Sequence, residues 1–248
     1  MAEFGPRTRL DQLLVSRGLV ESRARARAAI DAGGVTVDGK PARAASQGVD
    51  ANCVLTVVEA HRWVGRGGVK LDHALGLWPV EVKGRVVLDV GASTGGFTEV
   101  CLARGAARVF AVDVGSGQMS PKLLGDARVI SLEQTDARTL DAGLIPEAPG
   151  LIVCDVSFIG LAKALPAALA LAAEGTDLIA LVKPQFEGGG PSDAGKKGVV
   201  KDDVARAGAV QRVSDWLEGL GWMVQATTES PITGGDGNVE FLLWARRG

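Results

Sequence analysis

Four ionisable residues in this sequence stand where acid–base chemistry could be carried out. Asp155 and Lys183 follow the apolar runs LIVC and LIALV, Glu240 precedes FLLW, and Lys70 follows a glycine-rich basic segment. Two cations and two carboxylates on separate elements can hold a hydroxyl group and remove its proton. The same side chains can instead form a structural salt-bridge cluster. We expect them to converge, because the strand ends of a parallel sheet share one rim.

A glycine-rich turn, VGASTGG, stands between an apolar strand pattern and a helix pattern. Gly91, Gly95 and Gly96 have no side chains, so a ligand can approach the backbone closely. The glycine order differs from G-x-G-x-x-G, so the nicotinamide dinucleotide fingerprint is absent. Asp113 ends the next strand, where a carboxylate can accept both ribose hydroxyls of a nucleoside, and Asp136 has the matching place after the third strand. Acidic residues at both places suit an adenosine without a 2′-phosphate.

From residue 71 onward, strand and helix patterns alternate along the chain. Strand patterns are found in RVVLDVGA, ARVFAVDVG, ARVISLEQTDAR, GLIVCDVSF, DLIALVKPQF and NVEFLLWARR. Helix patterns stand between them, in GGFTEVCLARGA, LAKALPAALALAA and DDVARAGAVQRVSDWLEGLGW. This order predicts an α/β fold with a mostly parallel sheet, helices on both faces, and ligands at the carboxyl ends of the strands.

The segment LDVGASTGGF, with acidic residues ending the second and third strands, resembles class I S-adenosylmethionine methyltransferases across residues 71–248. The resemblance implies a Rossmann-like, seven-stranded sheet whose last strand, VEFLLWA, is antiparallel and lies inside the sheet. It implies S-adenosylmethionine as the cofactor and no metal ion. It assigns cofactor binding to the turn and the strand ends, at Asp89, Gly91, Ser93, Gly95, Gly96, Phe97, Asp113 and Asp136.

The first 70 residues form a basic head on an acidic body. They hold 11 Lys/Arg and 7 Asp/Glu, whereas the remaining residues hold 16 and 22. Such a head suggests that it binds a polyanion. Leu10, Leu13 and Leu14 predict a helix that ends at Gly18, and Ser22 caps a second helix with arginines along one face. The segment VTVDGK then predicts a strand and a tight turn.

Two short helices, the second lined with arginines, and a following turn strand resemble the S4-type RNA-binding domain over about residues 7–58. The residues that carry this resemblance are Arg9-Leu10-Asp11, Ser22-Arg23, Ile30 and GGVTVDGK. It implies a small α+β domain that binds RNA. The basic residues expected to contact RNA are Arg7, Arg9, Arg23, Arg27, Lys40, Arg62, Arg66, Lys196 and Lys197. The alternative is an arginine face that is merely solvated.

The four ionisable residues match the Lys-Asp-Lys-Glu tetrad of RNA 2′-O-ribose methyltransferases of the FtsJ type. RGGVKLDHAL, CDVSFI, LVKPQFE and SPITGGDGNVEFLL are similar to segments of the TlyA family, which joins this domain to an S4-type head. The resemblance implies an S4-type domain at 1–60, a linker at 61–69 and an FtsJ-like domain at 70–248. It also implies 2′-O-methylation of cytidine in ribosomal RNA, as naked RNA or within ribosomal subunits.

Methyl transfer to a ribose hydroxyl needs a base, since a 2′-OH is a poor nucleophile. We expect Lys183 to be that base, because burial and a neighbouring cation such as Lys70 favour its neutral amine. Asp155 and Glu240 oppose this effect, so we expect them to orient Lys183 and the ribose.

Two other functions stay open at this point. The TlyA family is also described as haemolysin-like, which implies membrane lysis, and a ribosome assembly factor could hold donor and RNA without catalysis. The longest apolar stretch, LPAALALAA, is far shorter than the roughly 20 residues that span a membrane. Cys53, Cys101 and Cys154 have no paired spacing, and the N-terminus lacks a secretory apolar core, which predicts a cytoplasmic protein with reduced thiols.

Overall fold

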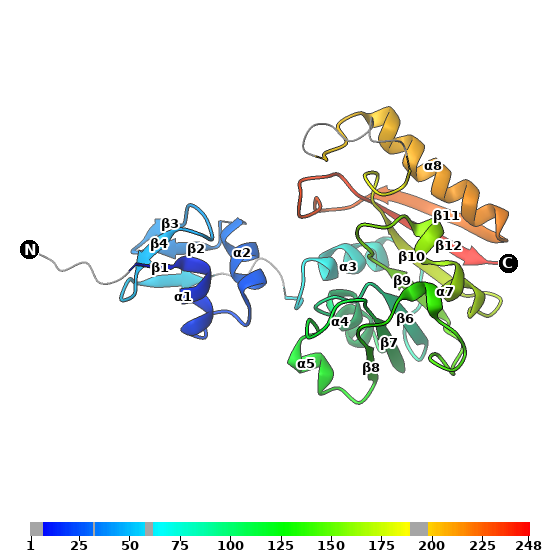
Figure 1. Cartoon of the computed structure of the whole chain (residues 1–248), viewed down its shortest axis with the longest axis horizontal. Coiled ribbons are helices and arrows are strands. Elements are labelled where there is room, and N and C mark those ends of the chain that lie inside the picture. Colours follow the sequence, from blue (N-terminus) through cyan, green and yellow to red (C-terminus); the bar gives the residue numbers. More distant parts are fainter. Residues whose placement is uncertain (1–6, 32, 58–61, 189–197) are drawn as a thin grey trace, which may run out of the picture. The chain divides into compact units, whose positions relative to one another are not determined.

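A computed structural model describes four stretches of the chain, residues 7–31, 33–57, 62–188 and 198–248. The chain divides into two compact units, Met1–Arg66 and Gly67–Gly248 (Figure 1). Lys196 and Lys197, which were expected to contact RNA, lie outside the described residues.

The first unit contains the two predicted helices and two small antiparallel sheets. Its elements are β1 (Arg7–Arg9), α1 (Leu10–Ser16), α2 (Arg23–Asp31), β2 (Val35–Val37), β3 (Lys40–Pro41), β4 (Gly48–Asp50) and β5 (Leu55–Val57). β1 pairs with β4, and β2 lies between β3 and β5. Asp38 and Gly39 form the predicted tight turn with φ values of 49° and 74°, which Gly and Asp tolerate better than most residues. Leu10, Leu14 and Ala26 are fully buried in its core.

The second unit is built on a seven-stranded sheet. Its strands are β6 (Val86–Val90), β7 (Arg108–Val112), β8 (Val129–Leu132), β9 (Leu151–Cys154), β10 (Asp177–Val182), β11 (Trp222–Glu229) and β12 (Phe241–Arg247). They lie in the order β11-β12-β10-β9-β6-β7-β8. β12 is antiparallel to both of its neighbours, and β10, β9, β6, β7 and β8 are mutually parallel. The antiparallel inner strand expected at VEFLLWA is therefore confirmed.

Helices cover both faces of this sheet. They are α3 (Gly67–Leu77), α4 (Gly96–Ala103), α5 (Pro121–Leu124), α6 (Leu161–Ala164), α7 (Pro166–Ala170), α8 (Asp203–Gly219) and the 3₁₀ helix η1 (Ala137–Thr139). On one face Leu88 and Val182 pack in a core with Val213 of α8. On the other face the Thr98 hydroxyl of α4 donates to Asp89. Because successive strand residues alternate between faces, each strand contributes to both cores.

Three details differ from the sequence expectations. The linker was expected to end at residue 69, but α3 begins at Gly67, so its last three residues are helical. β11 was not located from the sequence. It is an edge strand whose residues alternate between buried or half-buried and exposed positions. The helical spacing of Val204, Val213, Leu217 and Leu220 predicts one buried face for α8. Val213 and Leu217 are buried, whereas Val204 and Leu220 are exposed.

No helix in the described residues is long and apolar enough to cross a membrane. Cys53, Cys101 and Cys154 are buried free thiols, as expected.

A buried carboxylate fixes the end of the sheet that lies opposite the strand carboxyl ends. Asp177 begins β10 and is 2% exposed. It accepts hydrogen bonds from Arg85 Nη1 at 2.7 Å and from the Trp244 indole nitrogen at 2.9 Å. The Trp244 ring in turn stacks on Trp78, with centroids 6.1 Å apart. Asp177 thus joins strands β10 and β12 to the segment that leads into β6.

Replacing Asp177 by Ala should lower the free energy of unfolding by about 2 kcal/mol, because the half-buried Trp244 indole N–H loses its acceptor and Arg85, which keeps Gly150 O, loses its carboxylate partner. Asp203→Ala removes an exposed carboxylate that is paired with Arg206 and should cost less than about 1 kcal/mol. Urea unfolding of the full chain measures both. Equal losses in the two variants would contradict this role for Asp177.

Candidate active site

Alternation along the strands places three of the four predicted ionisable residues on one face of the sheet. Val182 and Cys154 point into the core on the α8 face, and Lys183 and Asp155 are the next residues along their strands. Phe241 packs against that same core and directly follows Glu240. Since neighbours in a strand point to opposite faces, Lys183, Asp155 and Glu240 belong to the α3 face.

The register of β10 and β12 brings two of these residues side by side. Val182 pairs with Phe241 in the antiparallel ladder, so Lys183 and Glu240 are next in line at the rim. The parallel ladder pairs Ala180 with Cys154, which brings Asp155 to the same rim. The predicted convergence therefore follows from strand pairing and requires no unusual backbone.

Lys70 forms one of two buried ion pairs. It lies on α3, and its ammonium contacts Glu240 Oε2. The two side chains are 8% and 4% exposed. Gly234 makes room for this carboxylate, because a methyl group at residue 234 would lie 2.5 Å from Glu240 Oε1. Glu240 is thus enclosed by α3 on one side and by the loop before β12 on the other.

Lys183 forms the second pair. Its Nζ lies 2.6 Å from Asp155 Oδ1 and donates a 2.8 Å hydrogen bond to Ser157 Oγ. The approach to Oδ1 is an ion pair without good hydrogen-bond directionality, and among the described residues Oδ1 has no hydrogen-bond partner. Ser157 was not singled out from the sequence. Its position two residues after the strand-end aspartate is the signal that could have found it.

Helix α3 contacts both carboxylates. A methyl group at Gly67 would lie 3.3 Å from Asp155 Oδ2, and Lys70 one turn later contacts Glu240. The positive end of a helix dipole therefore faces Asp155. The four predicted residues form two neighbouring pairs joined by one helix.

Asn238 fixes the loop that precedes Glu240. It is 1% exposed, and its Oδ1 accepts a 2.9 Å hydrogen bond from Val200 N. Its Nδ2 donates to Gly198 O at 3.2 Å, while its own carbonyl accepts from Gly234 N at 2.8 Å. Asn238 therefore ties residues 198–200 to the loop that surrounds the Glu240 carboxylate. Sequence reasoning missed it, since a single asparagine in a glycine-rich loop is usually a turn residue.

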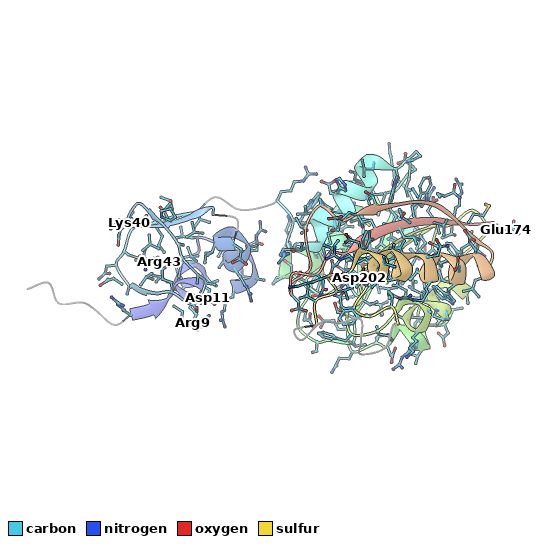
Figure 2. All side chains as sticks on the ribbon, turned by 90° about the horizontal axis from the view of Figure 1, so that it is seen from above. Arg9, Asp11, Lys40, Arg43, Glu174 and Asp202 are labelled. Atoms are coloured by element: carbon cyan, nitrogen blue, oxygen red, sulfur yellow. The ribbon has the colours of Figure 1, made fainter. Side chains whose placement is uncertain are left out.

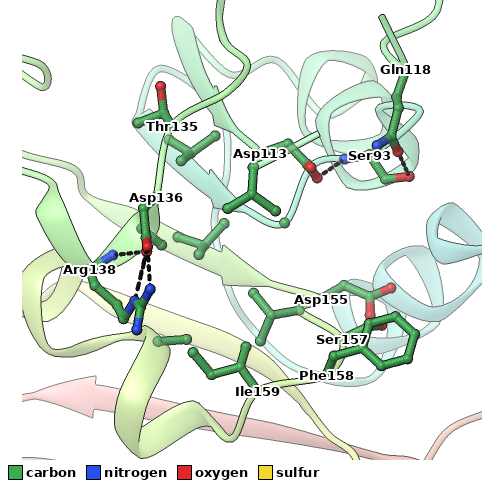
Figure 3. Close-up of a pocket in the computed structure, with 17 residues that line it drawn as sticks. Ser93, Asp113, Gln118, Thr135, Asp136, Arg138, Asp155, Ser157, Phe158 and Ile159 are labelled. Carbon is green, nitrogen blue, oxygen red and sulfur yellow. Dashed lines mark hydrogen bonds and ion pairs between the residues drawn. The ribbon is translucent and has the colours of Figure 1, made fainter. Parts of the chain in front are cut away.

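A cavity of about 480 Å³ lies at the carboxyl ends of the strands and is lined by Asp155 (Figure 3). Five of the predicted cofactor-binding or catalytic residues line it: Gly91, Ser93, Asp113, Asp136 and Asp155. Large apolar side chains line it at Val90, Val112, Val114, Val156, Phe158 and Ile159. The cavity size, apolar walls and few carboxylates suit a nucleoside-containing ligand.

Asp113 is held in place by backbone donors. Ser93 N donates to its Oδ2 and Gly115 N to its Oδ1, each at 2.7 Å. A carboxylate oxygen has two lone pairs, so each oxygen can still accept one further hydrogen bond. The adjoining loop is fixed by Glu133, whose carboxylate accepts from the backbone N–H groups of residues 117–119, and Gly117 N lowers its pKa most. Asp113 can therefore present two acceptors to a ribose diol.

Asp136 also lines the cavity, but its carboxylate is bound by Arg138. Arg138 Nε lies 3.0 Å from both Asp136 oxygens, and Nη2 lies 2.5 Å from Oδ2. These hydrogen bonds lower the pKa of Asp136 to about 2. An adenine amine that binds Asp136 must therefore share this carboxylate with Arg138, which the sequence did not indicate.

Two glycines of the turn are required by the protein itself. Gly91 has φ 85°, and a methyl group there would lie 2.8 Å from the Asp155 carbonyl oxygen. Gly95 has φ 93°, and a methyl group there would meet Leu123 Cδ1 at 2.2 Å. The expected reason for both glycines was close approach of a ligand. The structure adds a second reason for both, since their backbone is left-handed and neighbouring segments pack tightly against them.

Four residues assigned to cofactor binding do not line the cavity: Asp89, Gly95, Gly96 and Phe97. All four are buried around the start of α4. Asp89 is fully buried and accepts a 2.6 Å hydrogen bond from Thr98 Oγ1. Burial raises its pKa to about 7. These residues lie beneath the glycine-rich turn, in the protein interior, and support its conformation.

Phe158 is a further feature of the site that the sequence did not reveal. It is 88% exposed at the cavity and adopts a left-handed backbone with φ 67°. Its ring lies 5.4 Å from that of Phe186, which follows Lys183 by three residues. An exposed phenylalanine in this strained conformation is unusual for a residue with only a packing role.

A half-buried glutamate, Glu187, connects the two loops beyond these rings. Both Glu187 oxygens accept from Leu161 N at 3.1 Å, and burial raises the Glu187 pKa to about 7. The loop after Lys183 and the loop after Asp155 are therefore joined at their start, by Lys183 and Ser157, and further along, by Glu187 and Leu161.

The described basic residues expected to contact RNA all lie at exposed positions: Arg7, Arg9, Arg23, Arg27, Lys40, Arg62 and Arg66. Arg9 is labelled with Lys40 in Figure 2. The Arg62 guanidinium lies 4.2 Å from the centre of the Trp63 ring, and Trp63 is buried, as a packing role requires.

Comparison with known proteins agrees with this architecture. The FtsJ-like methyltransferase family model matches residues 63–247, and the S4 domain model matches residues 8–55. A protein of Mycobacterium tuberculosis named 16S/23S rRNA (cytidine-2′-O)-methyltransferase TlyA is 48% identical over 97% of this chain and 90% of its own length. The chain belongs to the TlyA family of FtsJ-like methyltransferases.

Other members of the TlyA family carry a different name. Hemolysin A of Brachyspira hyodysenteriae is 36% identical over 94% of this chain and 98% of its own length. A solved structure from Streptococcus thermophilus, named as a candidate hemolysin, is 37% identical, covers 98% of this chain and 89% of its own, and has a TM-score of 0.78. As an FtsJ-like methyltransferase, this TlyA-family chain is an enzyme that uses S-adenosylmethionine.

Because the pKa of Asp89 is raised in the folded protein, the free energy of unfolding should depend on pH. The folded-state pKa of about 7 lies above the ordinary 3.8, so folding favours the protonated acid. The stability that this provides is complete below about pH 4 and is lost as pH rises through 7. Asp89→Asn keeps an acceptor for Thr98 and cannot ionise. Its advantage over wild type should therefore grow from pH 5 to pH 8, by at most about 1.4 kcal/mol per pH unit.

Thermal unfolding at the two pH values measures this difference. Asp126→Asn is the matched control, since Arg128 lowers the Asp126 pKa to about 2 and that carboxylate is ionised throughout the range. A difference between Asp89→Asn and wild type that does not change with pH would show that Asp89 is not protonated in the folded protein.

Proposed function

We propose that this chain transfers a methyl group from S-adenosylmethionine to the 2′-hydroxyl of a cytidine in ribosomal RNA. The observation that carries the proposal is the pair of buried lysine–carboxylate contacts beside the cavity, Lys183 with Asp155 and Lys70 with Glu240. The names of the TlyA relatives support the nucleotide and the RNA. The S4 domain supports an RNA substrate independently, because it accounts for a basic head.

The residues around the cavity fit the donor. Asp113 would hold the ribose hydroxyls, Asp136 the adenine amine, and the valines of the lining would pack on the purine ring. Asp155, which lines the cavity and is paired with Lys183, places a carboxylate on the side where a cationic group would bind. When bound, S-adenosylmethionine supplies a methyl group on a positively charged sulfur. The remaining assigned residues, Asp89, Gly95, Gly96 and Phe97, hold the turn in shape.

The four ionisable side chains would prepare the RNA hydroxyl. Lys183 is the proposed base: its ammonium, paired with Asp155 in the resting site, first loses a proton to solvent, and the neutral amine then accepts the 2′-OH proton as the oxygen attacks. Asp155 and Ser157 fix the position of its Nζ, so the lone pair of the amine is directed at one place. Lys70 of α3 and Glu240, which directly precedes β12, form an enclosed ion pair next to Lys183 and would help to orient it. Placing the hydroxyl in line with the methyl group accounts for much of such a rate enhancement.

The division of labour along the chain follows from this activity. The S4-type domain, proposed at 1–60, would bind RNA, the segment from 61 to Arg66 would connect it, and Gly67–Gly248 would carry out the transfer. Ribosomal RNA or an assembling subunit is the proposed partner, which implies that the protein acts in the cytoplasm. Low aromatic content, 4% with no tyrosine, favours recognition through phosphates and RNA shape.

Tritiated methyl transfer from S-adenosylmethionine into naked ribosomal RNA and into both isolated subunits tests the proposal. Mass spectrometry of the labelled RNA should find 2′-O-methylcytidine. Release of dye from liposomes, measured with the same preparation, tests the activity implied by the hemolysin names. Dye release without methyl incorporation into any of these substrates would overturn the proposal.

Lys183→Ala should reduce methyl transfer by about 100-fold or more, which is the usual contribution of a general base. Binding of S-adenosylhomocysteine should be retained, because Asp113 and the apolar lining are unchanged. Lys163→Ala, at an exposed lysine of α6, is the control and should transfer methyl groups at the wild-type rate. Wild-type activity of Lys183→Ala would rule out this base.

Phe158 provides a stacking surface for a base of the bound RNA. Phe158→Ala should raise the KM for RNA about tenfold, because stacking on an aromatic ring stabilises each base by about 1–3 kcal/mol. Phe158→Trp should restore the KM, and Leu124→Ala, at another exposed apolar residue, should not change it. Steady-state kinetics at saturating donor measure these values. Equal KM values for Phe158→Ala and wild type would contradict the assignment.

A further inference from the structure

Asp11 of the N-terminal unit is a buried carboxylate shared by two exposed arginines. Arg9 donates through Nε to Oδ1 and through Nη2 to Oδ2, each at 3.0 Å. Arg23 donates to Oδ2 through Nε at 3.2 Å and Nη2 at 2.8 Å. The Asp11 side chain is 5% exposed, whereas those of Arg9 and Arg23 are 45% and 58% exposed. Figure 2 labels Arg9 and Asp11 in this unit.

Three elements meet at this carboxylate. Arg9 ends β1, Asp11 lies in the first turn of α1, and Arg23 begins α2. Backbone hydrogen bonds from Asp11 N to Ala45 O and from Gln12 N to Asp11 Oδ1, both at 3.0 Å, fix the carboxylate. Hydrogen bonds from Arg9, followed by those from Arg23, hold the pKa of Asp11 well below its usual range although burial opposes this. The two guanidinium groups are therefore positioned by a charge that persists at neutral pH.

The paired arginines keep donors for a ligand. A guanidinium has five N–H groups, and each arginine directs one from Nε and one from Nη2 at Asp11. Three N–H groups remain on each arginine. The cluster carries one net positive charge, since two cations share one carboxylate. Planar guanidinium groups with spare donors match the oxygens of a phosphate.

The other arginines of α2 are placed differently. Arg25 is 10% exposed and pairs with Glu21. Arg27 is 70% exposed, and its Nε lies 3.6 Å from Asp31 Oδ2, beyond hydrogen-bond distance. In this helix Arg23 alone is both exposed and held by a buried partner.

We propose that Asp11 is a positioning residue that presents Arg9 and Arg23 together to a single phosphate group of the RNA backbone. The inference rests on the proposed function only in taking RNA as the partner. An arginine already fixed in place loses less conformational freedom on binding, so the shared carboxylate strengthens binding although its charge repels phosphate.

Charge and arginine geometry predict opposite changes in RNA affinity for the variant Asp11→Asn. Asp11→Asn removes one negative charge from the basic head, so charge alone predicts tighter RNA binding. Loss of the fixed arginine geometry predicts weaker binding. Asp31→Asn makes the same charge change on α2 at an exposed ion pair and serves as the matched control.

Filter binding of full-length variants to ribosomal RNA fragments at several salt concentrations measures the effect. We expect Asp11→Asn to bind about five- to tenfold more weakly than wild type and Asp31→Asn to bind equally or more tightly. Circular dichroism and limited proteolysis check that the N-terminal unit is folded. A folded Asp11→Asn variant that binds as tightly as Asp31→Asn would overturn the proposal.

If Asp11→Asn does not fold, a double-mutant cycle of Arg9→Gln, Arg23→Gln and the double variant tests the same site. One shared phosphate predicts that the double variant loses much less affinity than the product of the two single losses. It also predicts that the slope of log K against log salt falls by about 0.9 in the double variant. Independent losses with about twice that change in slope would mean two separate phosphates and would contradict the proposal.

Methyl incorporation by wild type, measured on the same RNA, separates this proposal from the proposed function. RNA binding that depends on Asp11 without methyl transfer would support the paired arginines and contradict the enzyme assignment. Methyl transfer by wild type, with RNA binding that does not change in the Arg9 and Arg23 variants, would support the enzyme assignment and contradict the paired arginines.

Discussion

The antiparallel pairing of β12 with β10 is the constraint on which the rest of the site depends. Val182 opposite Phe241 brings Lys183 and Glu240 to the same place on the rim. A slip of one residue in this ladder would turn either side chain to the opposite face of the sheet. Helix α3 then closes over that face, with Lys70 against Glu240 and Gly67 against Asp155. Asp177 and Trp244 fix the far end of the same two strands.

The site holds four charges in a largely buried place because they form two neutral pairs. An unpaired buried ion is costly, whereas each lysine here lies against one carboxylate. The pairs differ in their surroundings. Glu240 is almost fully enclosed, but Asp155 is 19% exposed and lines the cavity, and Lys183 also reaches the Ser157 hydroxyl. The Lys183 pair is therefore the one that a ligand can reach, which is why we assign the proton transfer to Lys183.

Much of this architecture was predictable from local patterns. Apolar runs ending in Asp155 and Lys183 defined two strands, and the order of elements predicted a sheet with helices on both faces. The pairing of Lys70 with Glu240 depends on residues 170 positions apart, and only the fold determines it. The neighbours that modify each site residue were also beyond local patterns, because Arg138, Ser157 and Asn238 belong to residue types that are common in loops. Composition could identify the basic head, whereas only the structure shows that two of its arginines share Asp11.

Glycine illustrates the same limit. Close approach of a ligand was the sequence-based reason for Gly91 and Gly95, yet the atoms that leave no room for a side chain there belong to Asp155 and Leu123. A glycine-rich turn reports that something approaches the backbone closely. It does not report whether that neighbour is a ligand or the protein itself.

A crystal structure of this protein with S-adenosylhomocysteine tests the central claim most directly, because that claim concerns where the donor lies relative to the two ion pairs. Our account predicts that both ribose hydroxyls donate to Asp113 and that the sulfur lies beside the Lys183–Asp155 pair. A ligand that leaves Asp113 unbound, or whose sulfur points away from Lys183, would contradict it.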